Sequence, residues 1–125
     1  MVRPPIFEVS INAAANQLRI TLRGAIDAKA MQSCVEDVAK QLPSLKGNFK
    51  ILTDLSGVQS MDAGSVPHVE RLMDLCREKG TALVVRVIPK RSKDVGFNIL
   101  SLFHYPRTVH IVTCTTLAEA EKALS

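Results

Sequence analysis

Residues 49–65 read FKILTDLSGVQSMDAGS, and this stretch predicts a strand, a tight loop and the start of a helix. The apolar run 49–55 has the length and composition of a buried strand. The residues after it are polar or small, and Ser65 suits a helix N-cap, with Pro67 in the first turn. A helix N-terminus exposes free backbone N–H groups, so it favours an anionic group such as a phosphorylated side chain. We therefore expect the functional surface in this segment.

The residues before this stretch predict a hairpin and a helix. Residues 6–11 alternate weakly between apolar and polar side chains, residues 17–23 alternate cleanly, and residues 12–16 predict the turn between them. Residues 24–27 read GAID and predict the end of the second strand, with Asp27 placed to cap a helix. The apolar side chains of that helix recur at helical spacing, at Met31, Cys34, Val35, Val38 and Leu42.

The residues after it continue the alternation of helices and strands. A second amphipathic helix should bury Val66, Val69, Leu72, Met73 and Cys76, with Gly80 after its end. Residues 81–88 predict a central strand, residues 92–103 a short helix capped by Ser92, residues 109–113 a further strand, and residues 116–124 a helix that opens on a capping box. The order ββαβαβαβα predicts an α/β fold, with a mixed sheet of about five strands and helices packed on it, as one domain over residues 1–125.

Composition excludes several classes of function. The chain has 125 residues, a net charge of +4, no Trp and one Tyr, which argues against an aromatic platform for nucleic acid. We interpret the basic residues near 86–93 as a solvated loop. No stretch approaches the roughly 18 apolar residues of a membrane span, and no leader segment is evident. We expect a cytoplasmic protein without a membrane span.

The cysteines agree with a reduced compartment. Cys34, Cys76 and Cys114 are odd in number and form no C-x-x-C pair. Cys34 and Cys76 occupy apolar positions of helical patterns, so we expect them to be small buried hydrophobes. No metal-ligand spacing is present, and we expect neither a metal nor a cofactor.

Several of these motifs, taken together, resemble the STAS domain, the fold of bacterial anti-sigma-factor antagonists. The resemblance extends from about Phe7 to Leu124 and implies a SpoIIAA-like fold. GAID at residues 24–27 is similar to the family's Gly-Glu-Leu-Asp strand end, and DLSGV at residues 54–58 is similar to its Asp-Leu-Ser-x-Val motif. The closing LAEAEKAL at residues 117–124 resembles the family's last helix.

The resemblance also carries a departure at the phosphorylation site. Antagonist-type members have Asp-Ser-Ser-Gly or Asp-Ser-Thr-Gly, and a partner kinase phosphorylates the first hydroxyl, whereas this chain has DAGS at residues 62–65. Asp62 matches the family's aspartate, and Ala63 stands at the acceptor position. Displaced acceptors would be Ser65, Ser56 or Ser60. Asp27 and Asp62 match acidic positions that should lie near each other at one end of the sheet, although both also suit simple helix caps.

The resemblance implies a non-enzymatic interaction and signalling module. We expect it to dock through the loop 56–60 and the helix start at 62–68, on a partner such as a kinase-type anti-sigma factor, a signalling assembly or a transporter component. The residues expected on this surface are Ser56, Gly57, Ser60, Asp62, Ala63, Gly64, Ser65 and His68.

Two alternatives belong to other classes. Related STAS-like proteins are thought to bind lipids or other apolar ligands, as part of a transport system. In this chain Phe97, Phe103 and Tyr105 would form such a ligand surface. The competing interpretation is that they belong to an ordinary core helix. Ser65, His68 and Asp62 are spaced as a nominal catalytic set. Residues of one helical turn rarely reach the geometry that catalysis needs, so we do not expect an enzyme.

Overall fold

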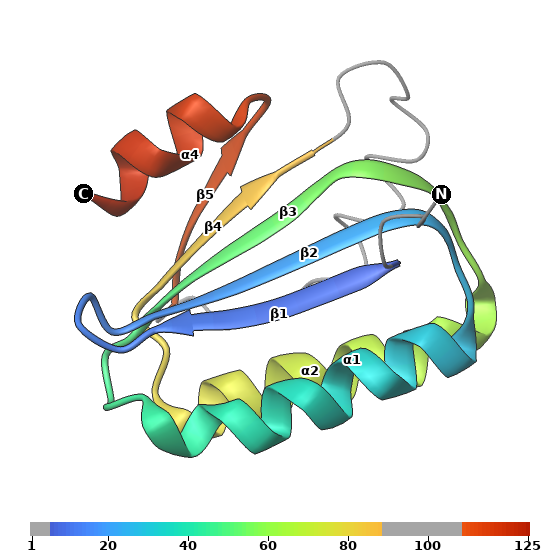
Figure 1. Ribbon diagram of the computed structural model, residues 1–125, viewed down its shortest axis with the longest axis horizontal. Coiled ribbons are helices and arrows are strands. Elements are labelled where there is room, and N and C mark those ends of the chain that lie inside the picture. The colour runs from blue at the N-terminus through green and yellow to red at the C-terminus, as the bar shows by residue number, and fades with distance from the viewer. Residues whose placement is uncertain (1–5, 89–108) are drawn as a thin grey trace, which may run out of the picture.

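The opening hairpin and the parallel strands that follow it form one mixed sheet (Figure 1). The computed structural model describes residues 6–88 and 109–125, and in them the strand order is β1-β2-β3-β4-β5. β1 is antiparallel to β2, and the other neighbours are parallel. The strands are β1 Phe7–Asn12, β2 Gln17–Ile26, β3 Lys50–Met61, β4 Leu83–Val87 and β5 His110–Cys114. The α/β fold with a mixed sheet is confirmed.

Helices cover both faces of this sheet. They are α1 Ala28–Gln41, α2 Val66–Lys79 and α4 Leu117–Leu124, with short 3₁₀ turns η1 Leu42–Ser44 and η2 Ala63–Ser65. Figure 1 shows α1 and α2 side by side on one face and α4 on the other. The larger core lies under α1 and α2 around the fully buried Phe49, and a smaller core lies under α4 around Val85.

The ends of the helices follow from local side chains. The Asp27 carboxylate accepts a hydrogen bond from the Ala30 N–H at 2.8 Å, so the predicted N-cap of α1 is confirmed. α2 ends at Gly80, whose φ of +101° is the left-handed conformation that glycine adopts at low cost. The Thr116 hydroxyl accepts from the Glu119 N–H at 3.2 Å and caps α4.

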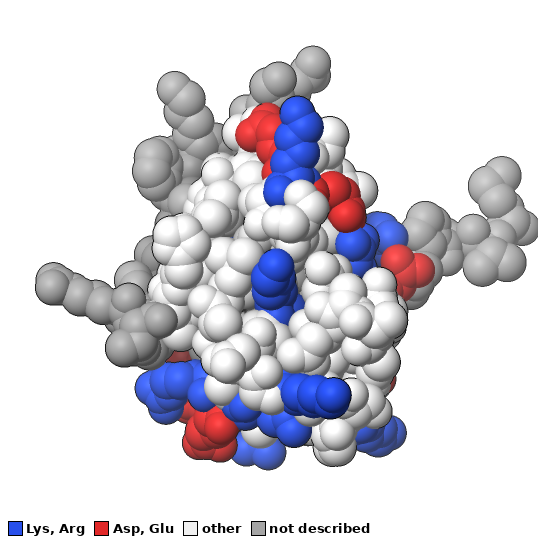
Figure 2. All heavy atoms as spheres, turned by 90° about the vertical axis from the view of Figure 1, so that its left-hand side faces the viewer, with Lys and Arg blue, Asp and Glu red and all other residues white. Residues whose placement is uncertain are grey.

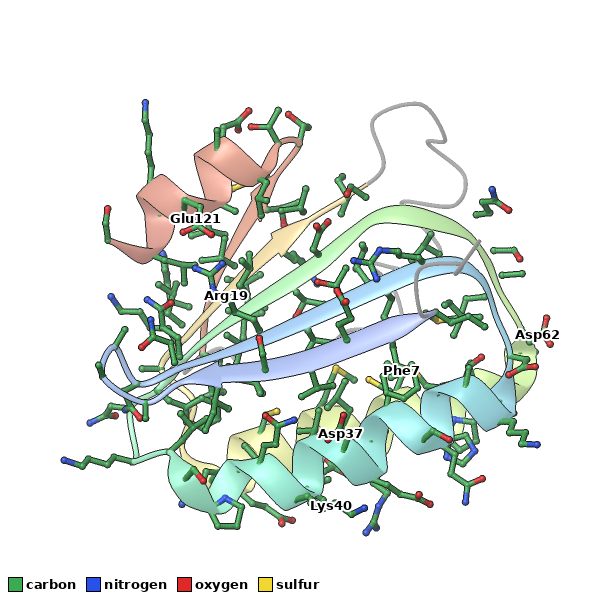
Figure 3. The ribbon with its side chains drawn as sticks, in the orientation of Figure 1. Phe7, Arg19, Asp37, Lys40, Asp62 and Glu121 are labelled. Atoms are coloured by element: carbon green, nitrogen blue, oxygen red, sulfur yellow. The ribbon has the colours of Figure 1, made fainter. Side chains whose placement is uncertain are left out.

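Side chains of β2 and β3 fasten α4 to the sheet. Arg19 and Glu121 form an ion pair at 2.7 Å, and Figure 3 shows the two side chains pointing toward each other. The Lys50 ammonium group donates to the Leu124 carbonyl at 2.8 Å. On the face that Figure 2 shows, Lys and Arg side chains gather along the lower edge, with acidic side chains among them, and others lie singly higher up.

β2 and β3 are longer than the sequence predicts. The expected loop at residues 56–60 is wrong, because β3 continues to Met61 and pairs with β2 as far as Ile26. The register shifts twice in this part, so bulges replace the loop. Gly24 of β2 has a φ of +72° there. The Asp54 carboxylate holds one bulge by accepting from the Ser56 N–H at 3.0 Å and the Ser56 hydroxyl at 2.6 Å.

Candidate functional site

The carboxyl ends of β2 and β3 bring the two acidic residues together. Ile26 pairs with Met61, and the Asp62 N–H donates to the Ile26 carbonyl at 2.9 Å. Asp27 and Asp62 each follow one of these paired residues, so the backbone brings the two positions together at one end of the sheet. Figure 3 shows Asp62 where β3 turns into η2. Both residues are exposed.

The two aspartates have different structural roles. Asp27 caps α1 through its carboxylate. Asp62 precedes η2 in an extended conformation, and its side chain makes no capping hydrogen bond there. The interpretation of both residues as caps is therefore correct for Asp27 and wrong for the Asp62 side chain. The Asp62 carboxylate is left at the surface with no part in capping.

Ala63 and Gly64 form the exposed turn next to Asp62. Both residues belong to η2 and are exposed. A Cβ atom on Gly64 would lie 3.4 Å from the Ala28 Cβ of α1, so Gly64 lies close to the start of the neighbouring helix. Ala63 presents only a methyl group and offers no hydroxyl for modification.

Ser65 occupies the N-cap position of α2, as the sequence predicts, but its side chain does not cap the helix. It is fully buried and adopts a helical conformation, and no capping hydrogen bond is made to its side chain. Its hydroxyl instead donates to the Ile26 carbonyl at 3.4 Å. A cap residue needs a non-helical backbone, and here the extended residue is Asp62, three positions earlier. Burial also puts the Ser65 hydroxyl out of reach of a kinase in the folded state.

The nominal catalytic set is not assembled around Ser65. The Ser65 hydroxyl is engaged with a backbone carbonyl of β2, whereas an activated nucleophile needs an imidazole as hydrogen-bond partner. His68 lies half-buried in the first turn of α2. Among the described residues, no group of three or more His, Cys, Asp or Glu side chains is arranged to hold a metal ion.

The other residues expected on the docking surface lie at two separate places along β3. Ser60 pairs in register with Ala25 and lies beside the turn, exposed like Asp62. Ser56 and Gly57 lie roughly 15–20 Å from Asp62 along the strand, at about 3.3 Å per residue. The Ser56 hydroxyl is held by Asp54, and Gly57 lies against the Arg23 side chain. The structure thus joins Ser60, Asp62, Ala63 and Gly64 to Asp27 but leaves Ser56 and Gly57 apart.

The remaining candidates are the cysteines and the apolar region. All three cysteines are buried, and burial raises the pKa of Cys34 and of Cys76 to about 12, with smaller contributions from Asp37 at Cys34 and from Cys34 at Cys76. These thiols are therefore poor nucleophiles. The predicted helix at 92–103 and the candidate ligand surface of Phe97, Phe103 and Tyr105 lie outside the described residues.

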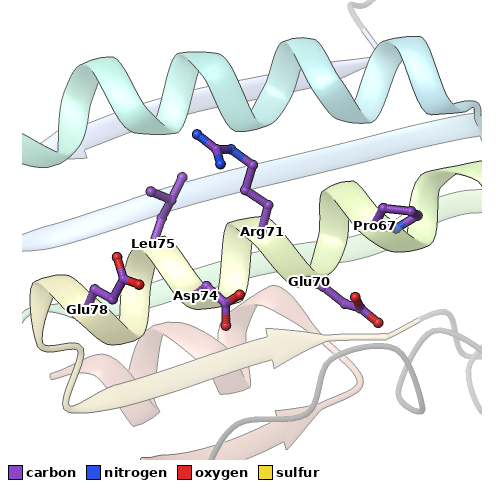
Figure 4. Close-up of a pocket in the computed structure, with 6 residues that line it drawn as sticks. All are labelled: Pro67, Glu70, Arg71, Asp74, Leu75 and Glu78. Carbon is purple, nitrogen blue, oxygen red and sulfur yellow. The ribbon is translucent and has the colours of Figure 1, made fainter.

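A shallow, open pocket that was not predicted from the sequence lies on the outer face of α2 (Figure 4). It has a volume of about 270 Å³, and Figure 4 shows Arg71 and Leu75 pointing toward α1 while Glu70 and Asp74 point away from it. Glu70, Asp74 and Glu78 recur every four residues, and this spacing predicts that they share one face of the helix. The full lining is Pro67, Glu70, Arg71, Asp74, Leu75 and Glu78. Pro67 lies two residues after η2, so this pocket is close in the chain to the exposed turn.

Comparison with solved structures defines the class of fold. The unphosphorylated anti-sigma factor antagonist SpoIIAA is 16% identical, with a TM-score of 0.61, covering 94% of this chain and 96% of that one. A protein of the DUF3478 family from Shewanella loihica, described as having a SpoIIAA-like fold, is 9% identical with a TM-score of 0.68, covering 100% and 98%. Phosphorylated SpoIIAA from Bacillus is 17% identical with a TM-score of 0.58, covering 95% and 99%. The chain therefore has a SpoIIAA-like fold.

The family follows from the sequence itself. The STAS domain model matches residues 8–120, and the chain belongs to this family. No curated protein matches the chain. Among the described residues, no helix has the length and apolar character to cross a membrane.

Proposed function

We propose that this protein is a non-enzymatic docking module of the anti-sigma-factor-antagonist type whose interaction is not switched by phosphorylation at the usual position. The observation that carries the proposal is the exposed Ala63 at the first position of η2, beside Asp62 and Gly64. Alanine cannot accept a phosphoryl group, so the surface keeps the charge of an unmodified site.

The docking surface consists of the exposed turn and its surroundings: Asp27, Ser60, Asp62, Ala63 and Gly64. The small side chains of Ala63 and Gly64 allow a partner backbone to approach closely. The Asp62 carboxylate makes no capping bond, so its charge is available to a donor on the partner. Glu70 and Glu78 of the α2 pocket extend the same surface and favour a partner with basic residues at its rim, whereas Asp74 is ion-paired with Arg77 at 3.1 Å.

The partner that the family resemblance favours is a kinase-type anti-sigma factor in the cytoplasm. Two of the structural neighbours are SpoIIAA, which is described as an anti-sigma factor antagonist and is known in unphosphorylated and phosphorylated forms. A signalling assembly or a transporter component would use the same turn. Ser56 is a candidate for phosphorylation that is exposed. Its hydroxyl donates to the Asp54 carboxylate, so a phosphate on Ser56 would face a like charge.

The test is a matched pair of glycine variants. Gly64→Glu places a bulky charge on the docking turn, where the added Cβ would meet only the Ala28 Cβ at 3.4 Å. Gly47→Glu places the same charge before the start of β3, at the opposite end of the sheet, where a Cβ meets nothing within 4 Å. Tagged wild type and both variants are used to capture proteins from a lysate of the source cells, and mass spectrometry identifies them.

We expect the wild type and Gly47→Glu to recover the same protein in stoichiometric amount and Gly64→Glu to lose it. Circular dichroism of all three chains controls for folding. Equal recovery by Gly64→Glu and the wild type would contradict docking at this turn.

A further inference from the structure

Within the described residues, the outer edge of β1 carries backbone groups without a strand partner. β1 is the terminal strand of the sheet formed by the described residues, and it pairs with β2 alone. The Arg23 N–H donates to the Ile6 carbonyl at 2.7 Å. Pairs in an antiparallel ladder alternate between bonded and non-bonded, so this bond fixes the alternation along the whole strand. The residues whose N–H and C=O groups point outward are Phe7, Val9 and Ile11.

A hydrogen bond from α1 confirms that the Val9 carbonyl points away from β2. The Gln41 amide donates to the Val9 carbonyl at 3.0 Å and to the Asp37 carboxylate at 3.0 Å. Within residues 6–88 and 109–125, Gln41 is the side chain that bonds to this edge. It satisfies one acceptor of the edge and none of its N–H donors.

Apart from the Gln41 side chain, β1 carries few of the features that usually prevent edge pairing. Natural edges are blunted by Lys, Pro or a bulge, but β1 reads FEVSIN and its pairing with β2 has no register shift. Its one charged residue, Glu8, is paired with Arg23 at 2.7 Å. Phe7, Val9 and Ile11 are half-buried toward α1, and Figure 3 shows Phe7 on that side.

We propose that β1 pairs antiparallel with β1 of a second copy of this chain, about a two-fold axis at Val9, so that the two sheets become continuous. In this register Phe7 lies opposite Ile11, and Glu8 lies opposite Ser10. Apolar residues meet apolar residues, a carboxylate meets a hydroxyl, and no like charges face each other. Every outward residue faces an outward residue of the other copy and exchanges backbone bonds with it, as a closed two-fold interface requires, and the Val9 carbonyl accepts from both Gln41 and the partner N–H.

A hollow beside the start of β1 fits the same arrangement. It has a volume of about 400 Å³, and its lining is Ile6, Phe7, Asp27, Lys29, Ala30 and Ser33. Ile6 is 46% exposed, which is unusual for a large apolar side chain in this molecule. Ile11 of the second copy lies opposite Phe7 on the helix side, next to this hollow, and covers its apolar lining.

Val9→Pro tests the pairing with little disturbance of the hairpin. The Val9 N–H points outward, so proline removes both bonds of the central pair while the β1–β2 ladder keeps its own bonds. Val9→Thr retains the N–H group and serves as the control. Sedimentation equilibrium from low micromolar to millimolar concentration should show a monomer–dimer equilibrium, with the Kd of Val9→Pro raised at least about tenfold and that of Val9→Thr nearly unchanged.

Gln41→Ala provides a change in the opposite direction. It frees the Val9 carbonyl from its internal donor, so the Kd of self-association should fall. Amide hydrogen exchange gives a readout without any variant, because the N–H groups of Phe7, Val9 and Ile11 should become protected as the concentration rises. A wild-type chain that stays monomeric at millimolar concentration, or equal Kd values for wild type and Val9→Pro, would overturn the proposal.

The paired edge residues Phe7, Val9 and Ile11 lie outside the docking turn, and only the hollow beside them shares a residue with it, Asp27. The pairing of β1 can therefore be tested separately from the proposed function. Loss of a captured foreign protein in Val9→Pro, without self-association of the wild type, would assign the edge to a foreign strand. That outcome would also overturn pairing with a second copy.

Discussion

Three consecutive positions at the end of β3 show how small changes in side chain decide what this surface can do. Ala63 and Gly64 are exposed, whereas Ser65, the residue with a hydroxyl, points inward to the Ile26 carbonyl. Under the proposed function, Ala63 puts a methyl group where antagonist-type members carry a hydroxyl, and the nearest serine, Ser65, packs inward. Asp62 and its neighbour Asp27 put negative charge on this turn.

The buried thiols at the interface of α1 and α2 predict a loss of stability at alkaline pH. Burial raises the pKa of Cys34 and Cys76 from 9.0 to about 12, so the folded chain keeps protons that the unfolded chain releases. The stability from neutral thiols is complete below about pH 9 and falls as pH rises toward 12, by at most about 1.4 kcal/mol per pH unit for each thiol.

Guanidinium denaturation of the reduced protein at neutral pH and near pH 10 measures this loss. The double variant Cys34→Ala/Cys76→Ala is less stable at every pH because of the cavities, but its stability should depend less on pH than that of the wild type. The same pH dependence in both chains would show that these thiols do not titrate on unfolding.

At the scale of elements, the two aspartates provide a direct comparison of a cap with a docking residue. Asp27→Ala should lower the free energy of unfolding by about 1 kcal/mol, because α1 loses its N-cap. Asp62→Ala should change it by less than about 0.5 kcal/mol, because the Asp62 carboxylate caps nothing. Chemical denaturation measures both values, and Asp27→Asn, which keeps a capping oxygen, is the control. Equal losses in the two alanine variants would mean that Asp62 is a structural cap.

The elements also show which local signals predict structure reliably. α1 and α2 follow the predicted apolar stripes. A helix that packs on a sheet needs apolar side chains on its buried face, and their helical spacing is visible in the sequence. The second half of β3 was missed because the described β4 pairs with it only as far as Asp54. Of the residues after Asp54 in β3, only Leu55 and Val58 are buried, and the exposed small and polar side chains between and after them are typical of a loop. Bulges and the positive φ of Gly24 adapt β2 to this segment. Such irregular pairing has no simple periodic signal in the sequence.

At the scale of the whole molecule, the alternation of strands and helices was enough to predict the mixed sheet, and the resemblance predicted the SpoIIAA-like fold. The site could be predicted only in part. Asp27 and Asp62 are far apart in the sequence, and the pairing of Ile26 with Met61 brings them together. The inward rotation of Ser65 depends on packing against β2 and could not be read from a serine that suited an N-cap.

The central claim is that a partner docks on the turn at Asp62, Ala63 and Gly64, and that this turn carries no phosphate. The most direct test is the affinity of the captured partner for wild type, Ala63→Ser and Ala63→Glu, measured by titration calorimetry. Ser adds only a hydroxyl, so its Kd should stay within about threefold of wild type, whereas Glu fills the space that the small Ala63 side chain leaves for the partner backbone and should weaken binding at least about a hundredfold. Binding of Ala63→Glu with the wild-type affinity would contradict the account.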